Sequence, residues 1–109
     1  MRIGVKEIIH DFPKRLPYSH KGTYGKILNM AGSAYYAGAA ILSSLSALKV
    51  GAGYVTLACP ENIAAAVISY TPDITIFPLK SNGISSTSEN LDTLLKKAED
   101  YDVISIGSG

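Results

Sequence analysis

Short apolar segments alternate with helix-like segments from residue 26 to residue 106 of this 109-residue chain. The apolar segments have the length of strands and are rich in β-branched, aromatic or aliphatic residues. They cover residues 26–32, 53–59, 73–79 and 102–107. Because parallel strands are joined by right-handed helical crossovers, this alternation predicts a parallel sheet. The predicted fold class is therefore α/β, with a Rossmann-like parallel sheet.

Two helices are expected between the first three of these strands. Residues 38–50 place apolar side chains at helical spacing, and Gly51 suits the left-handed residue that ends a helix. Pro60 suits the first turn of the next helix, and Glu61 is favourable at its positive end. We expect Pro72 to end that second helix.

A third helix is expected over residues 89–101, where the pattern is clearly amphipathic. In the strand before it, Pro78 lacks an N–H for a sheet ladder, which indicates a strand end or a sheet edge. The apolar face of the helix would consist of Leu91, Leu94, Leu95 and Ala98.

The composition describes a chain that can bury a core. Hydrophobic residues make up 47% and charged residues 17%, which excludes a disordered chain. The formal net charge of +1 gives no electrostatic support to a nucleic-acid or anionic-membrane partner.

The single cysteine, Cys59, excludes an internal disulfide framework and favours a reducing, cytoplasmic compartment. The first twelve residues make a poor signal peptide, and no apolar run reaches the ~18 residues that a membrane span needs.

Glycine-bearing loops follow two of the strands, at residues 32–39 and 107–109. In open parallel sheets, ligands collect beyond the carboxyl ends of the strands. The amides near Gly38 and Ala39 would begin a helix, point outward and carry partial positive charge. The pattern therefore predicts that a phosphate or pyrophosphate binds at this loop.

A glycine pair around a strand-to-helix turn is also typical of a tight connection that binds nothing, and this alternative stays open. The loop is not a Walker A site, because no Gly-Lys-Ser/Thr follows it. Residues 51–53, Gly-Ala-Gly, lie before a strand rather than after one, so a helix cap and turn is the better interpretation there.

Other reactive side chains give weak signals. His10, His20 and Cys59 are not at metal-ligand spacing, which predicts no metal site. Tyr35 and Tyr36 could stack on a planar ring, although we expect at least one of them to pack under the following helix.

Asp100 and Asp102 flank the last strand at its amino end, away from the predicted ligand edge, and are expected to be solvated. Cys59 at a strand end is expected to be a small buried hydrophobe. The sequence presents no pair of nucleophile and base.

Three motifs together carry a resemblance to a known family. The first, His-Lys-Gly followed by a gap and a glycine, is formed by His20, Lys21, Gly22 and Gly25. The second, in which a strand ends in Gly-Ser and Gly-Ala opens a helix, is formed by Gly32, Ser33, Gly38 and Ala39. The third, a Gly-x-Gly turn before a Val-Thr strand, is formed by Gly51, Gly53, Val55 and Thr56. Over residues 15–109 the chain resembles the ADP- or ATP-dependent NAD(P)H-hydrate dehydratases of the ribokinase-like superfamily.

The resemblance implies a three-layer ribokinase-like fold, incomplete in this chain. Residues 1–14 would be a linker or N-terminal extension, and residues 15–109 the first part of the domain. The implied activity is a lyase reaction that repairs nicotinamide cofactors: hydrated NADH or NADPH loses water while ADP or ATP is hydrolysed with Mg²⁺. The family's cofactor contacts correspond to the backbone of Ala39 and Gly109. With the neighbouring glycines, the predicted substrate-binding residues are Gly38, Ala39, Gly107 and Gly109.

The chain departs from the family pattern in one loop and lacks later motifs. Ser108 replaces a proline between two glycines, and we expect the loop to survive this loss of a fixed φ. The catalytic aspartate motif would lie beyond residue 109. We therefore predict no catalytic residue and no metal ligand in this chain, and no activity for the chain alone.

A parallel sheet cut at this point would expose a strand edge and apolar surface. We therefore expect the chain to form a homo-oligomer or to associate with the remainder of the domain. Two alternatives to the dehydratase stay open. One is a fragment of a ribokinase-like kinase for a vitamin precursor or sugar, and the other is a non-catalytic nucleotide-binding or interaction module.

Overall fold

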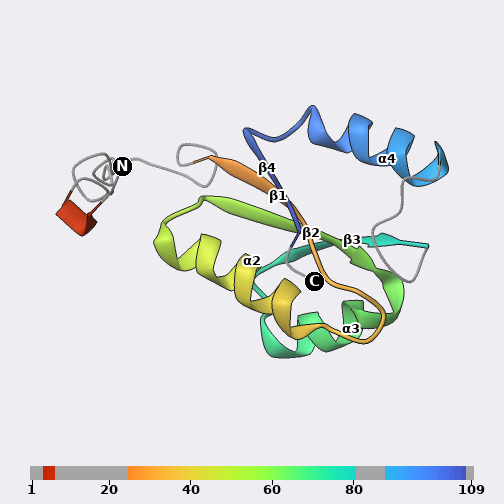
Figure 1. Cartoon of the computed structure of the whole chain (residues 1–109), viewed down its shortest axis with the longest axis horizontal. Coiled ribbons are helices and arrows are strands. Elements are labelled where there is room, and N and C mark those ends of the chain that lie inside the picture. The colour runs from red at the N-terminus through yellow and green to blue at the C-terminus, as the bar shows by residue number, and fades with distance from the viewer. Residues whose placement is uncertain (1–3, 7–24, 81–87, 108–109) are drawn as a thin grey trace.

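The computed structural model describes residues 4–6, 25–80 and 88–107. Strands and helices alternate along it, as the sequence predicts (Figure 1). In chain order the elements are β1 (Lys26–Met30), α2 (Gly38–Val50), β2 (Tyr54–Pro60), α3 (Glu61–Tyr70), β3 (Thr75–Leu79), α4 (Ser88–Ala98) and β4 (Val103–Ile106).

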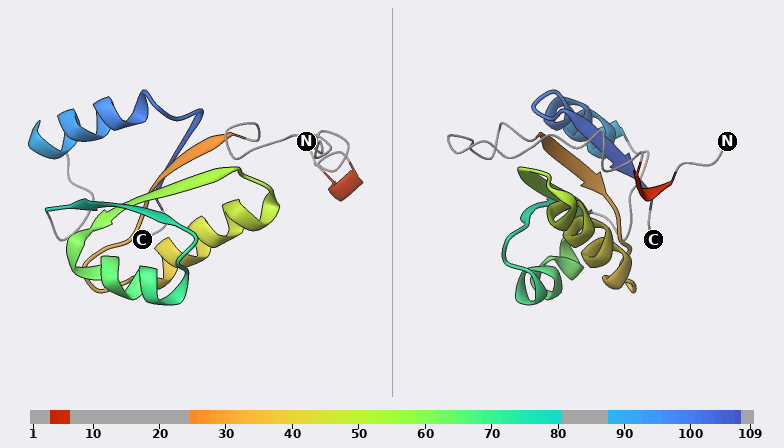
Figure 2. Two further views of the ribbon diagram at one scale, coloured as in Figure 1. Left: turned by 180° about the vertical axis from the view of Figure 1, so that it is seen from behind. Right: turned by 90° about the vertical axis from the view of Figure 1, so that its left-hand side faces the viewer.

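All pairings in the sheet are parallel, and the strand order is β3-β2-β1-β4. Helices α2 and α3 cover one face of the sheet, and α4 covers the other (Figures 1 and 2). The predicted α/β class with helices on both sides of a parallel sheet is therefore confirmed. Pro78 lies in β3 at one edge of the sheet, where its missing N–H breaks no ladder between inner strands.

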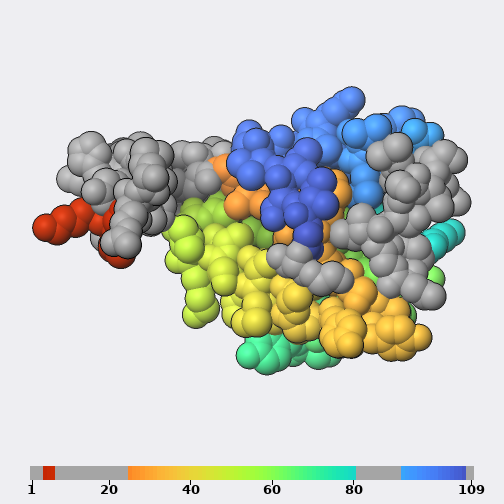
Figure 3. Space-filling model, in the orientation of Figure 1, coloured from red at the N-terminus to blue at the C-terminus, as the bar shows by residue number. Residues whose placement is uncertain are grey.

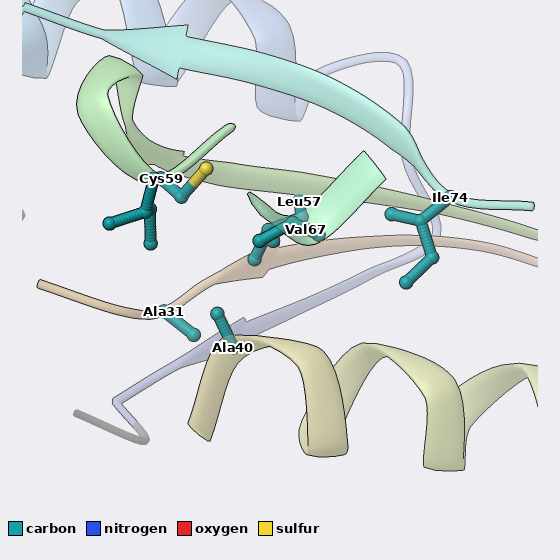
Figure 4. Close-up of a cluster of buried hydrophobic side chains, with 7 residues drawn as sticks. Ala31, Ala40, Leu57, Cys59, Val67 and Ile74 are labelled. Atoms are coloured by element: carbon teal, nitrogen blue, oxygen red, sulfur yellow. The ribbon is translucent and has the colours of Figure 1, made fainter. Parts of the chain in front are cut away.

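The larger core lies between the sheet and the helices α2 and α3. Side chains from β2, α2 and α3 converge there, and Cys59 is fully buried among them, as predicted (Figure 4). Small residues on α2 let this helix approach the sheet closely: its buried residues are Ala40 and Ser44. The cluster consists of Ala31, Ala40, Leu57, Cys59, Ile63, Val67 and Ile74.

A second core lies under α4. Leu94 is buried against Leu28 and Met30 of β1 and neighbouring strand residues, and Ala98 packs beside it. The prediction that Leu95 belongs to the apolar face of this helix is wrong, because 59% of its surface is exposed. Adjacent helical positions point about 100° apart, so only one of the two leucines can face the sheet.

Of two further expectations about helix ends, the one for Pro60 is adjusted and the one for Gly51 is confirmed. Pro60 is not in the first turn of α3 but is its N-cap and the last residue of β2, with an extended ψ of 138°. Gly51 ends α2 with a φ of +125°, and its N–H donates to carbonyl oxygens of the last turn, as a glycine cap should.

The edge strand β4 is covered on neither face by the described residues. Val103, Ile104 and Ile106 are 54%, 46% and 72% exposed. Figure 3 shows this strand at the molecular surface. None of the described helices is long and apolar enough to cross a membrane.

Candidate functional site

The strands β1 and β4 end side by side at one edge of the sheet. Met30 is in register with Ile106, and the Gly107 N–H donates to the Met30 carbonyl oxygen at 3.1 Å. The loop after β1 and the segment that begins at Gly107 therefore leave the sheet from adjacent positions. Gly107 has a φ of +128° and open space around it, while Gly109 lies outside the described residues.

Gly32 serves packing rather than ligand approach. Its φ is +90°, and a side chain at this position would lie 2.8 Å from the Ile63 Cδ1 atom and 3.1 Å from the Ala40 Cβ atom. The positive φ strains any residue that has a Cβ, and such a Cβ would crowd Ala40 and push aside the end of the Ile63 side chain, so glycine suits this turn between α2 and α3. For Gly32, the interpretation as a tight connection is the correct one.

The turn after Gly32 is held by backbone hydrogen bonds between Ser33 and Tyr36, at 3.1 and 3.4 Å. From α3, the Asn62 Nδ2 atom donates to the Ala34 carbonyl oxygen at 3.1 Å. Tyr35 and Tyr36 are 88% and 69% exposed, so the expectation that one of them packs under the helix is wrong.

The start of α2 has the geometry expected of an anion site. Ala37 is the N-cap, no side chain caps the helix, and its first turn contains no acidic residue. The first hydrogen bond along the helix is from the Ile41 N–H to the Ala37 carbonyl oxygen at 3.0 Å. The N–H groups of Gly38 and Ala39 thus have no acceptor inside the helix, and they carry its partial positive charge.

Gly38 differs from Gly32 in its surroundings. A Cβ atom at Gly38 would meet nothing within 4 Å, and the residue is exposed. A ligand can therefore reach the backbone of Gly38 without displacing any described side chain. The structure brings Gly38, Ala39 and Gly107 to the same end of the sheet, because the loop to α2 follows β1 and Gly107 follows its parallel neighbour β4.

A polar network in the core supports the start of α2, and the sequence analysis missed it. Asn29, next to the last residue of β1, is 3% exposed and donates from Nδ2 to the Ser43 and Ser44 Oγ atoms at 2.8 and 2.9 Å. The Ser43 hydroxyl donates to the Ala39 carbonyl oxygen at 2.8 Å. The available signal was an asparagine inside an otherwise apolar strand, facing a helix with adjacent serines.

At the other end of the strands, where they begin, the protein has a hollow of about 320 Å³ lined by Lys26, Tyr54, Asp100 and Tyr101. The two tyrosine rings stack with centroids 6.5 Å apart. Asp102 is exposed, but it is not merely solvated as expected. Its carboxylate accepts a hydrogen bond from the backbone N–H of Lys26 at 2.9 Å. This hollow lies at the amino ends of the strands, away from both glycine-bearing loops.

The described residues supply no obvious reactive group. Burial raises the pKa of the Cys59 thiol to about 11, which keeps it protonated and poorly nucleophilic. Within the described ranges, no three His, Cys, Asp or Glu side chains lie close enough together to hold a metal ion.

Residues 27–109 match the family model for NAD(P)H-hydrate dehydratase, which is most of the chain. The chain belongs to the NAD(P)H-hydrate dehydratase family. The resemblance recognised from the glycine motifs is therefore confirmed. The match does not test the predicted boundary at residue 15 or the role of residues 1–14.

Curated relatives of the family align with more than four fifths of this chain in the two examples that follow. The bifunctional NAD(P)H-hydrate repair enzyme Nnr of Dictyoglomus turgidum is 44% identical over 92 residues, covering 83% of this chain and 18% of that protein. The ATP-dependent (S)-NAD(P)H-hydrate dehydratase of Pediculus humanus subsp. corporis is 34% identical over 85% of this chain and 29% of that protein. The chain thus spans less than a third of the length of these relatives.

Solved structures confirm the ribokinase-like fold of this dehydratase-family chain. A ribokinase-like superfamily protein from Enterococcus faecalis superposes with a TM-score of 0.71 at 25% identity, over 88% of this chain and 31% of that one. The ADP/ATP-dependent NAD(P)H-hydrate dehydratase of Bacillus subtilis, co-crystallised with ATP and Mg²⁺, has a TM-score of 0.65 at 24% identity, over 93% of this chain and 43% of that one.

Proposed function

We propose that this chain forms the hydrated-cofactor side of an NAD(P)H-hydrate dehydratase site. The reaction would repair hydrated NADH or NADPH by removing water, coupled to hydrolysis of ADP or ATP. The observation that carries the proposal is that the adjacent strands β1 and β4 lead to two glycines in open space, Gly38 at an uncapped helix start and Gly107, in a chain of this family. We also propose a cytoplasmic location. The cytoplasm keeps thiols reduced, which suits the free Cys59, and it contains the nicotinamide cofactors that the reaction would repair.

The chain's own contribution would be binding and orientation. The N–H groups of Gly38 and Ala39 would donate to phosphate oxygens of the cofactor, where the helix start stabilises negative charge. Gly107 and Gly109 would contact the same cofactor from the end of the neighbouring strand β4 and allow it to approach the backbone. Phosphoryl transfer to the cofactor's hydroxyl, followed by elimination, needs positioning and charge neutralisation above all. This chain would supply the positioning.

Adenine nucleotide and Mg²⁺ belong to the proposed reaction, but we assign them no ligand in this chain. The described residues bring together no set of carboxylate, imidazole or thiolate groups that fits a magnesium ion. We therefore derive no step through the ion, and we assign no catalytic residue to the chain.

A coupled assay and a binding measurement test the proposal. The chain is mixed with hydrated NADH, ATP or ADP and Mg²⁺, and recovery of NADH absorbance is followed. Binding of hydrated NADH is measured separately by calorimetry. We expect saturable binding without turnover from the 109-residue chain, and weaker binding from Gly38→Val, whose side chain would fill the open space beside the amides.

The matched control is Gly38→Ala, which adds one methyl group at the same open position. It should bind more tightly than Gly38→Val. Absence of binding by the unsubstituted chain, or equal affinity of all three proteins, would exclude the proposed site.

A second candidate is a part of a ribokinase-like small-molecule kinase, favoured by the fold shared with the Enterococcus faecalis protein. It would use the same edge of the sheet for a vitamin precursor or sugar. Competition distinguishes the two, because only the dehydratase proposal predicts that hydrated NADH binds and that a neutral sugar does not displace it.

A further inference from the structure

Asn29 is a buried polar residue whose position lowers the stability of the fold. Its side chain is 3% exposed, and the residue lies next to the last position of β1, paired with Leu57 on one side and Ser105 on the other. Its Oδ1 atom is buried and has no hydrogen-bond partner among the described residues. A leucine or valine would fill this strand position without burying an unpaired acceptor. The fold alone therefore gives no reason for an amide here.

The contacts of the amide nitrogen point to the reason. The Nδ2 atom has two hydrogens and uses both, one toward the Ser43 Oγ atom and one toward the Ser44 Oγ atom. Ser43 accepts from Asn29, so its own hydrogen remains for the Ala39 carbonyl oxygen at 2.8 Å, with the Ala40 carbonyl oxygen at 3.3 Å. The result is a directed chain of hydrogen bonds from the inner strand β1 to the first turn of α2.

Packing locates this turn only in part. Ala40 and Ser44 are the fully buried residues of α2, and such small side chains do little to fix the position of a helix along a sheet, while Ile41 in the first turn packs against the core but is only partly buried. Hydrogen bonds from an inner strand supply the missing constraint, because β1 is paired on both edges.

We infer that Asn29 is a positioning residue for the cofactor site. Acting through Ser43, it fixes the first turn of α2 so that the amides of Gly38 and Ala39 are preorganised toward the phosphate groups of hydrated NAD(P)H. This inference rests on the proposed function for its ligand, although the rigidity of the turn can be measured without any ligand.

The test compares Asn29→Leu and Ser43→Ala with the unsubstituted 109-residue chain. We expect hydrated NADPH to bind about fivefold more weakly to each variant, the loss of roughly one hydrogen bond. The variant with both substitutions should bind hydrated NADPH as tightly as the weaker-binding single variant, because both substitutions break the same chain of hydrogen bonds. Ser43→Thr keeps the hydroxyl and should retain the original affinity.

Amide hydrogen exchange distinguishes local loosening of the first turn of α2 from general destabilisation of the fold. The Ile41 N–H, bonded to the Ala37 carbonyl oxygen, should exchange faster in Asn29→Leu and Ser43→Ala. The Ala52 N–H, bonded to the Ala47 carbonyl oxygen at the other end of α2, should be unaffected. The control is Ser69→Ala, which removes a serine-to-carbonyl bond within α3 and should change neither affinity nor exchange at Ile41.

Each outcome decides the inference. Unchanged affinity and unchanged Ile41 exchange in Ser43→Ala would overturn it, even if Asn29→Leu failed to fold. Uniformly faster exchange throughout α2 in both variants would show general destabilisation and would also overturn it. If the unsubstituted chain does not bind hydrated NADPH, the proposed function fails, and the exchange data still decide whether Asn29 fixes the turn.

Discussion

Two glycines in the loop between β1 and α2 differ in what they require of the chain. Gly32 has a positive φ and is in contact with Ile63 and Ala40, whereas Gly38 is in open space at the helix start. The sequence shows both as members of one motif and cannot separate them. Only the packing of α2 against α3 shows that one glycine is needed for folding and that the other leaves access to the backbone.

Alanine substitutions should separate these roles. We expect Gly32→Ala to lower the free energy of unfolding by about 1–3 kcal/mol, because it combines a strained φ with a contact below 3.0 Å. Gly38→Ala should change it by less than about 1 kcal/mol, in the stabilising direction, because alanine favours a helix. Urea denaturation measures both, and equal losses in the two variants would contradict these roles.

Cys59 makes the stability depend on pH in the alkaline range. Burial raises its pKa from 9.0 to about 11 in the folded chain, so the unfolded chain gives up this proton first. Between these two pH values the unfolded state binds fewer protons, and the free energy of unfolding must fall as the pH rises. Cys59→Ala should show a shallower decline over the same range in urea denaturation. An identical decline would show that the buried thiol does not contribute.

At the scale of elements, the sequence predicts the order of strands and helices well. Apolar segment lengths and helical spacing locate every described strand, and α2 has its predicted bounds. The shared edge of the two glycine-bearing loops follows from the rule for parallel strands. The exposed tyrosines and the true N-cap of α3 could not be predicted, because they depend on how α2 and α3 approach the sheet. For the network of Asn29 the sequence offers only an asparagine within a strand and adjacent serines in the next helix, without the contacts that join them.

Helix α4 offers a direct test of its corrected face. Leu94 is 5% exposed and Leu95 is 59% exposed, although both were expected on the apolar face. We expect Leu94→Ala to cost about 2–4 kcal/mol of unfolding free energy through a cavity against β1. Leu95→Ala should cost less than about 0.5 kcal/mol, as exposed substitutions generally do. Thermal and urea denaturation measure these losses of stability. Equal losses, or a larger loss for Leu95→Ala, would contradict the orientation of α4 in which Leu94 faces the sheet.

At the scale of the whole molecule, the described chain presents an uncovered edge strand. Val103, Ile104 and Ile106 expose apolar surface on both faces of β4, and such edges favour association with another strand or chain. We propose that β4 pairs with the remainder of the domain or with a second copy of the chain.

Sedimentation velocity tests this association. The 109-residue chain should show mass that increases with concentration, and Ile106→Lys should reduce the association by placing a charge on the edge strand. Ile68→Lys is the matched control, because Ile68 is 49% exposed on α3, away from β4. A monomer at all concentrations, or equal effects of the two lysine substitutions, would contradict a role for β4.

The central claim is that Gly38, Ala39 and Gly107 bind one ligand together at the carboxyl edge of the sheet. The most direct measurement is a titration of the isotope-labelled chain with hydrated NADPH, followed by the amide chemical shifts. We predict that these three amides shift along one common saturation curve, while amides at the other edge, such as those of Lys26 and Tyr101, stay in place. Shifts confined to the Lys26 and Tyr101 edge, or different saturation curves for Ala39 and Gly107, would contradict the claim.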